Sequence, residues 1–274
     1  MNILKDRFKG RTILITGSTS GIGEATALRA AAEGANIVVN GRNAERGNAV
    51  VDRIKADGGE AIFVQADLTI EAEVDKLFDT AFEKYGEIQL FVNNAGMICP
   101  PDRLIEFRNE DWFETMDTNV TSMFYCCRRE VQHLMQTGKP GSIVNLGSIA
   151  GMRGFPSSCA YVTSKHAVNG LTKAIAMEYA HKNIRCNSVN PCGCGSPLNH
   201  RTDIAYKEKM GKVAMEGGDP MAYLSEWLGG KRLSPLGRLG TVDEEAAAIL
   251  FFLSDDASFI TGAIVAVEGG WGVY

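Results

Sequence analysis

Short apolar runs rich in β-branched residues alternate with longer helical patterns along almost the entire chain. This alternation indicates parallel βαβ units, because a strand can return parallel to its neighbour only through a crossover connection, which is usually a helix. Right-handed crossovers place helices on both faces of one sheet. The sequence therefore predicts an α/β protein with a doubly wound, Rossmann-like fold, built on a seven-stranded parallel sheet with helices on both faces.

Seven segments have the composition of strands, and their near-continuous hydrophobicity suits strands that helices cover on both sides. They are Thr12–Thr16, Asn36–Val39, Ala61–Gln65, Ile88–Val92, Gly141–Leu146, Ile184–Val189 and Ala263–Val267. The helical patterns between them are Ile22–Glu33, Ala44–Ala56, Glu71–Tyr85, Asn109–Met135, Tyr161–His181 and Val242–Leu253. Because no internal repeat or linker divides these elements, we expect one domain over residues 1–274.

One long stretch, from Pro191 to Gly240, breaks this rhythm and carries most of the late glycines and prolines. Loops of such length in compact domains are usually functional, so we expect a substrate lid over approximately residues 192–236. Its flexible and flat apolar side chains suit an apolar ligand. They are Met210, Met215, Met221, Tyr223, Trp227 and Leu228. The alternative is that they pack the segment onto its own domain or onto a neighbouring subunit.

The charge balance points to small molecules as partners. A formal net charge of -5 argues against binding to nucleic acid or to acidic lipid, since both require basic surface. No signal peptide and no uncharged apolar run of about 18 residues is present, so we expect no membrane segment and a cytoplasmic location. The seven cysteines lack the pattern of a disulfide framework or a zinc site, so we expect reduced thiols and no metal.

A glycine-rich turn follows the first strand, with Gly17, Gly21 and Gly23 spaced over the start of a helix. The first glycine allows a tight turn, the other two allow backbone to approach a pyrophosphate, and the helix offers free N–H groups at its positive end. A tight strand-to-helix turn also needs glycine, which is the simpler alternative. The cofactor-binding residues predicted here are Gly17, Ser18, Thr19, Ser20, Gly21, Ile22 and Gly23.

The end of the second strand bears on the choice of cofactor. In a dinucleotide-binding fold an acidic residue at this position accepts hydrogen bonds from the ribose, whereas an arginine pairs with a 2'-phosphate. Gly41 stands where the acid would be, and Arg42 follows it. We therefore favour NADP(H) over NAD(H). The alternative is a solvated arginine at the start of a helix.

Tyr161 and Lys165 lie four residues apart on a predicted helix and so share one face. A phenol with a reference pKa of about 10 is a poor base at neutral pH, but a neighbouring ammonium stabilises the phenolate and lowers that pKa. Ser148 ends a strand that opens onto the same crevice, where its hydroxyl can hold a substrate oxygen. Taken singly, such residues are more often surface or turn residues.

Together with further motifs at matching positions, these features resemble the short-chain dehydrogenase/reductase family over nearly the whole chain. The further motifs are Asp67 in Ala66-Asp67-Leu68, Asn93 to Gly96, Asn119 in Thr118-Asn119-Val120, and Asn187 to Pro191. The resemblance implies a catalytic set of Asn119, Ser148, Tyr161 and Lys165. Tyr161 would exchange the substrate proton and Ser148 would orient the oxygen. Lys165 would lower the tyrosine pKa and bind the nicotinamide ribose, and Asn119 would hold a water beside it.

The resemblance also implies further contacts to the cofactor. Asp67 and Leu68 would flank the adenine, and Asn94, Ala95 and Gly96 would support the central strand and contact ribose. Pro191, Gly193 and Ser196 would lie near the nicotinamide. One departure is Cys192, which stands where the family usually has glycine, removes φ > 0 freedom and brings a thiol near the reaction centre. We expect no cysteine nucleophile, since hydride transfer needs no covalent intermediate.

The predicted function is an NADP(H)-dependent oxidoreductase that interconverts a secondary alcohol and a ketone on a bulky apolar, hydroxysteroid-like substrate. Its predicted substrate contacts are Ser148, Ala150, Met152, Tyr161 and Cys192, with Met97, Ile98, Cys99 and Phe155 as further apolar wall. The alternatives are a 3-oxoacyl carrier-protein reductase, a polyol or sugar dehydrogenase and, in a different class, a non-catalytic NADP(H)-sensing protein. The resemblance further implies a homotetramer or homodimer that uses the final strand and tail.

Overall fold

The computed structural model describes residues 3–155, 157–194 and 234–273. Their strands form one seven-stranded parallel sheet in the order β3-β2-β1-β4-β5-β6-β7, which confirms the predicted fold class. The strands are β1 (Thr12–Ile15), β2 (Asn36–Gly41), β3 (Glu60–Gln65), β4 (Leu90–Asn93), β5 (Gly141–Leu146), β6 (Ile184–Pro191) and β7 (Ile264–Val267). The strand order reverses between β1 and β4, which creates a crevice at the carboxyl ends of these two strands.

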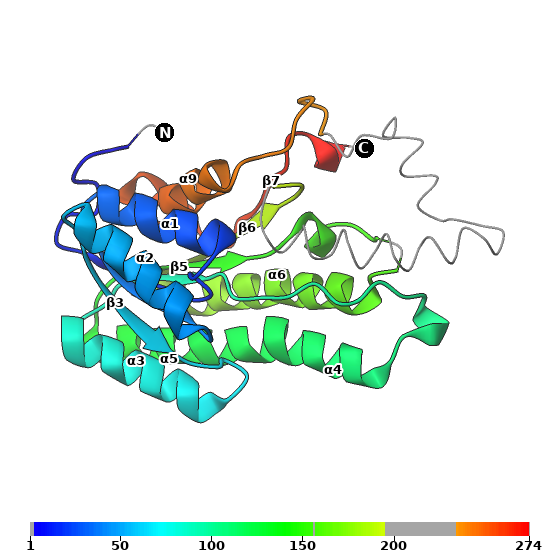
Figure 1. Ribbon diagram of the computed structural model, residues 1–274, viewed down its shortest axis with the longest axis horizontal. Coiled ribbons are helices and arrows are strands. Elements are labelled where there is room, and N and C mark those ends of the chain that lie inside the picture. Colours follow the sequence, from blue (N-terminus) through cyan, green and yellow to red (C-terminus); the bar gives the residue numbers. More distant parts are fainter. Residues whose placement is uncertain (1–2, 156, 195–233, 274) are drawn as a thin grey trace.

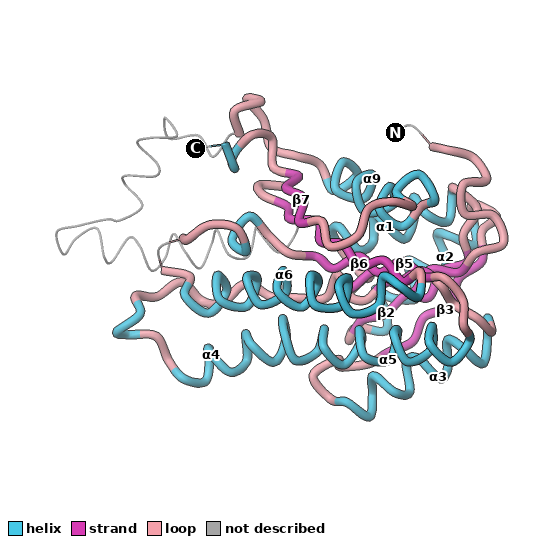
Figure 2. Tube along the Cα trace, turned by 180° about the vertical axis from the view of Figure 1, so that it is seen from behind, coloured by secondary structure: helices cyan, strands magenta, loops and turns pink. Residues whose placement is uncertain are grey.

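Helices cover both faces of the sheet, as Figures 1 and 2 show from opposite sides. One face carries α1 (Gly21–Ala32), α2 (Ala44–Ala56) and α9 (Val242–Leu253). The other carries α3 (Glu71–Tyr85), α4 (Asn109–Met116), α5 (Ser122–Thr137) and α6 (Cys159–Tyr179). None of the helices in the described ranges is long and apolar enough to cross a bilayer.

The alternation of side chains along β1 divides the core into two layers. Ile13 and Ile15 pack with the α1, α2 and α9 layer, whereas Leu14 packs with the α3, α5 and α6 layer. Successive residues of a strand point to opposite faces, so a strand covered on both sides must be apolar throughout. This is why the central strands lack the apolar-polar alternation of a half-exposed sheet.

The predicted helix Asn109–Met135 is not continuous. Between α4 and α5 the chain forms a π-helical turn, Asp117–Thr121, which inserts an extra residue into the turn. At its centre the amide of Asn119 donates to the main-chain oxygen of Met97 (2.9 Å) and accepts from the main-chain nitrogen of Met97 (2.7 Å). These two bonds tie the π turn to the segment after β4.

The predicted lid residues, from Met210 to Leu228, lie outside the described residues, as does Ser196. Residues 234–240 are described and run back from this stretch toward α9. Among them Gly240 donates a main-chain hydrogen bond to Gly193 at 3.1 Å, so the two ends of the stretch meet beside the crevice.

Candidate active site

Two adjoining pockets form one groove along the carboxyl edge of the sheet. The first lies over β1, β2 and β3 and the second over β5 and β6. They share Ile22, Asn94 and Gly96 in their walls, so they are continuous at the crevice between β1 and β4. An extended ligand can therefore lie across the switch point with its two ends in different pockets.

The glycine turn forms a cradle that side chains would fill. Gly17 has a φ of +60°, and a Cβ there would lie 2.8 Å from the Cα of Ala95. A Cβ on Gly23 would lie 2.6 Å from the main-chain oxygen of Gly17. The side chain of Ser20 makes no capping hydrogen bond at the start of α1, which leaves helix N–H groups for an anionic ligand. These features fit the pyrophosphate of a dinucleotide.

Buried polar side chains hold this turn in place. The amide of Asn94 donates to the main-chain oxygens of Thr16 (3.0 Å) and Gly17 (2.9 Å). The hydroxyl of Ser18 donates to the main-chain oxygen of Ile15 at 2.7 Å. Ser18 and Gly23, both predicted to bind cofactor, line neither of the two pockets and support the turn from behind.

The β2 end of the groove contains an ion pair. Arg42 lies 3.8 Å from the carboxylate of Asp67, which also accepts hydrogen bonds from the main-chain nitrogen (3.0 Å) and hydroxyl (2.8 Å) of Thr69. Burial acts to raise the pKa of Asp67, but the Thr69 hydrogen bonds and the Arg42 charge leave it below its ordinary value. The sequence did not identify Arg46, which lines the same pocket. The sequence feature that could have identified Arg46 is its place in the first turn of α2, which directly follows the capping residue Asn43.

Gly41 leaves room for the glycine turn itself. A Cβ at this position would lie 2.6 Å from the Cγ2 and 3.0 Å from the Oγ1 of Thr19. A larger residue at position 41 would therefore have to displace Thr19, which lines the same pocket.

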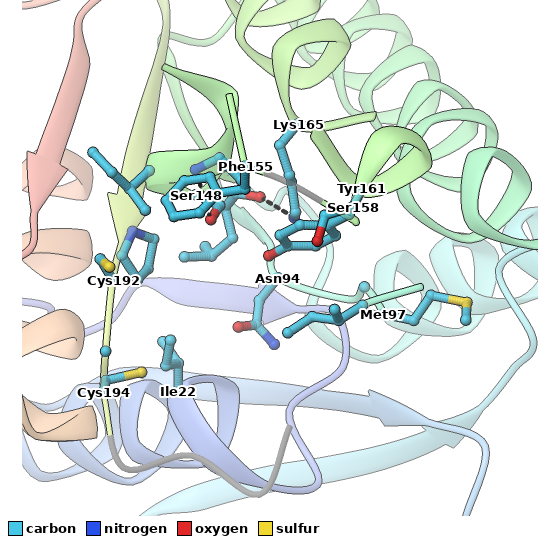
Figure 3. A pocket seen from close by; sticks show the side chains of 18 residues that line it. Ile22, Asn94, Met97, Ser148, Phe155, Ser158, Tyr161, Lys165, Cys192 and Cys194 are labelled. Atoms are coloured by element: carbon cyan, nitrogen blue, oxygen red, sulfur yellow. Dashed lines mark hydrogen bonds between the residues drawn. The ribbon is translucent and has the colours of Figure 1, made fainter. Parts of the chain in front are cut away.

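Ser148, Tyr161 and Lys165 point toward one another at the centre of the second pocket (Figure 3). Ser148 follows β5, and its main-chain nitrogen donates to the amide oxygen of Asn190 at 3.0 Å. Its hydroxyl accepts from the main-chain nitrogen of Ala150 at 3.1 Å and hydrogen bonds the phenol of Tyr161. The strand end, the following turn and the start of α6 thus bring the three predicted side chains together.

Burial controls the protonation of this pair. It raises the pKa of Tyr161 to about 12, against the smaller lowering effect of the Ser148 hydrogen bond. It also lowers the pKa of Lys165 to about 8. The net direction for the tyrosine is opposite to the one expected from the sequence, because desolvation of the phenolate outweighs the favourable interactions. The Lys165 ammonium lies 5.8 Å from the centre of the Tyr161 ring.

Asn119 lies beside this pair without a hydrogen bond to it. Besides its Met97 contacts, its amide donates to the hydroxyl of Ser164 at 3.0 Å. A Cβ on Gly96 would lie 3.1 Å from Asn119 Oδ1 and 3.5 Å from Lys165 Nζ. Gly96 therefore leaves open the space between the predicted catalytic asparagine and lysine.

The wall of the second pocket is largely apolar. Its apolar lining residues are Ile22, Met97, Ile98, Leu146, Ile149, Ala150, Phe155, Pro191, Cys192 and Cys194. Ser158, which the sequence did not identify, adds a hydroxyl. Two predicted wall residues do not line the pocket: Met152 is 42% exposed and Cys99 only 3% exposed, so one points outward and the other is in the core.

The turn after β6 tolerates a side chain at Cys192, because the left-handed backbone conformation is adopted by the next residue and not by Cys192. Gly193 has a φ of +60°, so the turn after β6 does not require glycine at position 192. Burial raises the pKa of the Cys192 thiol to about 12. The residue is therefore a thiol at neutral pH, and it lines the pocket as a small apolar group.

A doubly wound sheet with a glycine cradle at its switch point, leading to a buried serine, tyrosine and lysine, defines a nicotinamide-dependent oxidoreductase. Residues 11–207 match the family model described as short chain dehydrogenase, and the chain belongs to this family. It is an oxidoreductase that acts on secondary alcohols, with a nicotinamide dinucleotide as the cofactor of the family.

Two curated relatives and one solved structure show how far the similarity extends. A 3beta-hydroxysteroid dehydrogenase of Mediterraneibacter gnavus is 47% identical, with 98% of this chain and 97% of the relative covered. A cyclohexanol dehydrogenase of an Acinetobacter species is 38% identical, with 98% of each chain covered. The crystal structure of levodione reductase matches with a TM-score of 0.85 and 30% identity, over 97% of this chain and 99% of that one.

Proposed function

We propose that this protein is an NADP(H)-dependent oxidoreductase that interconverts a secondary alcohol and a ketone on a bulky apolar, hydroxysteroid-like substrate. The observation that carries the proposal is the apolar wall around the Tyr161 phenol, built from Met97, Ile149 and Phe155 among others. Both curated relatives are named for a secondary hydroxyl on a carbon ring, the larger ring system belonging to the more similar relative. A fused apolar ring system would bury surface against such a wall.

The roles of the central residues follow from their contacts. In ketone reduction the Tyr161 phenol donates its proton to the substrate oxygen, and its pKa of about 12 keeps that proton available at neutral pH. The Ser148 hydroxyl, fixed by Ala150 and Tyr161, holds the same oxygen in line. Alcohol oxidation needs the phenolate form of Tyr161. The nearby Lys165 ammonium lowers the free energy of forming this phenolate.

The residues present fit a dinucleotide. The glycine cradle would hold the pyrophosphate, Asp67 and Leu68 would flank the adenine, and Asn94 to Gly96 with Lys165 would hold the nicotinamide ribose. Pro191 and Gly193 would line the nicotinamide end. When bound, the nicotinamide accepts or supplies the hydride. The protein orients it, excludes water and exchanges the proton at the tyrosine oxygen.

Two arginines support NADP(H) over NAD(H). Arg42 and Arg46 line the pocket at the end of β2, where a ribose 2'-phosphate would lie. Gly41 provides no carboxylate that would repel this phosphate, and it leaves Thr19 in place. The Arg42 side chain is 75% exposed and its Nη1 lies 3.8 Å from the Asp67 carboxylate, so the other guanidinium nitrogens remain as donors for a phosphate.

We also propose one domain, a cytoplasmic location and a homo-oligomer, with the tetramer favoured over the dimer. The support for one domain is that the described strands belong to a single sheet. The support for assembly is β7, which forms the edge of the sheet and is only half-buried within one chain. Light scattering coupled to size-exclusion chromatography measures the assembly directly, and a monomeric mass would contradict it.

The experiment that tests the activity is a substrate panel with each cofactor. NADPH and NADH are titrated separately by intrinsic fluorescence, and turnover is then followed with a 3-ketosteroid, cyclohexanone, a 3-oxoacyl thioester and a sugar ketone. We expect tighter binding of NADPH and the highest kcat/KM with the 3-ketosteroid. Preference for NADH would refute the cofactor choice, and activity confined to the thioester or the sugar would refute the substrate class.

A further inference from the structure

The C-terminal turn, Trp271–Val273, packs against the turn that follows Ser148. The guanidinium of Arg153 donates a hydrogen bond to the main-chain oxygen of Gly272. A Cβ on Gly272 would lie 3.5 Å from the Cδ1 of Ile149, so the two turns are also in close van der Waals contact. Residues far apart in the sequence therefore meet on the outer side of the pocket wall.

The turn that Arg153 and the C-terminal turn contact is the one that orients Ser148, the predicted catalytic serine. Ile149–Gly151 begins directly after Ser148, whose hydroxyl accepts from Ala150 at 3.1 Å. On its inner side this turn is held by α6: the amide of Asn169 donates to the main-chain oxygen of Gly151 at 3.0 Å. Arg153 provides the matching constraint on the outer side, through the C-terminal turn.

The C-terminal segment is held in place by its own hydrogen bonds. Gly269 and Gly270 have φ values of +64° and +94°, and the main-chain nitrogen of Leu236 donates to Gly269 at 3.1 Å. A Cβ on Gly269 would lie 2.6 Å from the Cβ of Ser234. The main-chain nitrogen of Gly272 donates to the carboxylate of Glu268 at 2.7 Å. The segment is thus bound to Leu236 and closed by a hydrogen bond of its own, so it can act as a support.

We infer that Arg153 is a positioning residue for the reaction: by joining the C-terminal turn to Ile149–Gly151 it fixes the Ser148 hydroxyl and one wall of the substrate pocket. The inference rests on the proposed function, in which Ser148 orients the substrate oxygen. A guanidinium suits this task because it stays charged and donates in a fixed plane. Arg153 itself does not line the pocket, so it acts through the turn.

The test compares Arg153→Ala and Arg153→Lys with a chain lacking residues 271–274. Arg108→Ala, which changes an exposed arginine at the start of α4, is the matched control. For each protein we measure kcat and KM for 3-ketosteroid reduction, the Kd of NADPH by fluorescence, and the thermal midpoint. Hydrogen exchange of residues 148–155 in the NADPH complex reports the order of the turn without turnover.

We expect Arg153→Ala and the truncation each to lower kcat by about tenfold or more, because small misplacement of an orienting group is costly to the rate. The Kd of NADPH should stay within about twofold, exchange over 148–155 should rise, and the lysine variant should recover part of the rate. Combining alanine substitution with truncation should cost little beyond the truncation alone, since both remove the hydrogen bond between Arg153 and Gly272.

Wild-type kcat in Arg153→Ala, or unchanged exchange over 148–155, would overturn the inference. So would a loss of rate that only follows a lower thermal midpoint. If the wild-type protein reduces no ketone in the panel, the proposed substrate class fails, while the exchange measurement still decides whether Arg153 orders the turn after Ser148. The two failures are therefore distinguishable.

Discussion

The ammonium of Lys165 donates a 2.8 Å hydrogen bond to the main-chain oxygen of Leu146. This bond joins the first turns of α6 to the last residue of β5, so the helix that carries Tyr161 is fixed to the strand that leads to Ser148. The same bond keeps the Lys165 cation at the carboxyl edge of the sheet, where the residue is only 4% exposed. Burial makes this lysine lose its charge more easily than a lysine in water.

The first prediction concerns pH. Burial lowers the pKa of Lys165 to about 8, so its charge is present below that pH and is lost as the pH rises through it. Because a cation in contact with the cofactor ribose is proposed here, the Kd of NADPH should rise by about tenfold between pH 7 and pH 9.5. Lys165→Gln should bind more weakly at pH 7 and show little of this dependence. An equally steep dependence in the variant would assign the titration to another group.

The second prediction isolates the proton donor. Tyr161→Phe keeps the packing volume and removes the phenol oxygen, so turnover should fall by about 10²–10⁴-fold while the Kd of NADPH changes little. Ser148→Ala should lower kcat with the same retention of NADPH binding. Steady-state kinetics and fluorescence titration measure both. Retained turnover in Tyr161→Phe would remove Tyr161 from its proposed role.

The third prediction concerns the 2'-phosphate. Arg42→Ala should weaken NADPH binding by roughly tenfold or more, and Arg46→Ala should weaken it less, while NADH binding stays within about twofold. The stability cost should be small, because the Arg42 side chain is 75% exposed and lies as far as 3.8 Å from the Asp67 carboxylate. Isothermal titration of both cofactors against both variants gives the comparison. Equal weakening of the two cofactors would show that the arginines do not recognise the phosphate.

The fourth prediction concerns the core. Glu130 is fully buried, accepts a 3.1 Å hydrogen bond from the amide of Asn93, and has its pKa raised by burial to about 8. A raised carboxyl pKa means that its contribution to stability is full below the unfolded value, near 4.5, and is lost as the pH rises through about 8. Glu130→Gln should therefore gain stability relative to the wild type by ~1–3 kcal/mol between pH 5 and pH 9.

Urea unfolding of Glu130→Gln and the wild type at the two pH values measures this difference. An exposed glutamate of α3, Glu83, provides the control substitution Glu83→Gln. A stability difference between Glu130→Gln and the wild type that does not change with pH would show that the Glu130 carboxyl stays in one protonation state throughout.

The sequence predicted the fold well because the evidence for it is local and repeated. Every strand covered on both faces must be apolar, and every crossover must be long enough for a helix, so the order of elements is visible without contacts. The Tyr161 to Lys165 spacing likewise needs only helical geometry. These are properties of neighbouring residues, which the sequence contains directly.

What escaped prediction depends on packing between distant segments. Nothing local marks the π turn at Asn119, since the bonds that stabilise it come from Met97. The raised pKa of Tyr161 follows from burial by the assembled pocket. Ser18 has the position of a cofactor ligand, yet its hydroxyl is used within the turn. Met152 lies outward because the turn after Ser148 ends just before it.

The π turn at Asp117–Thr121 also sets a rule for exchanging helices between relatives. One residue changes the direction of an α-helical side chain by about 100°. Deleting a residue here would therefore rotate α4 relative to α5, turning Asn119 away from Met97 or moving the face of α4 that meets α6. A graft of α4 and α5 must therefore carry the five-residue turn as a unit, with the segment after β4 that it binds.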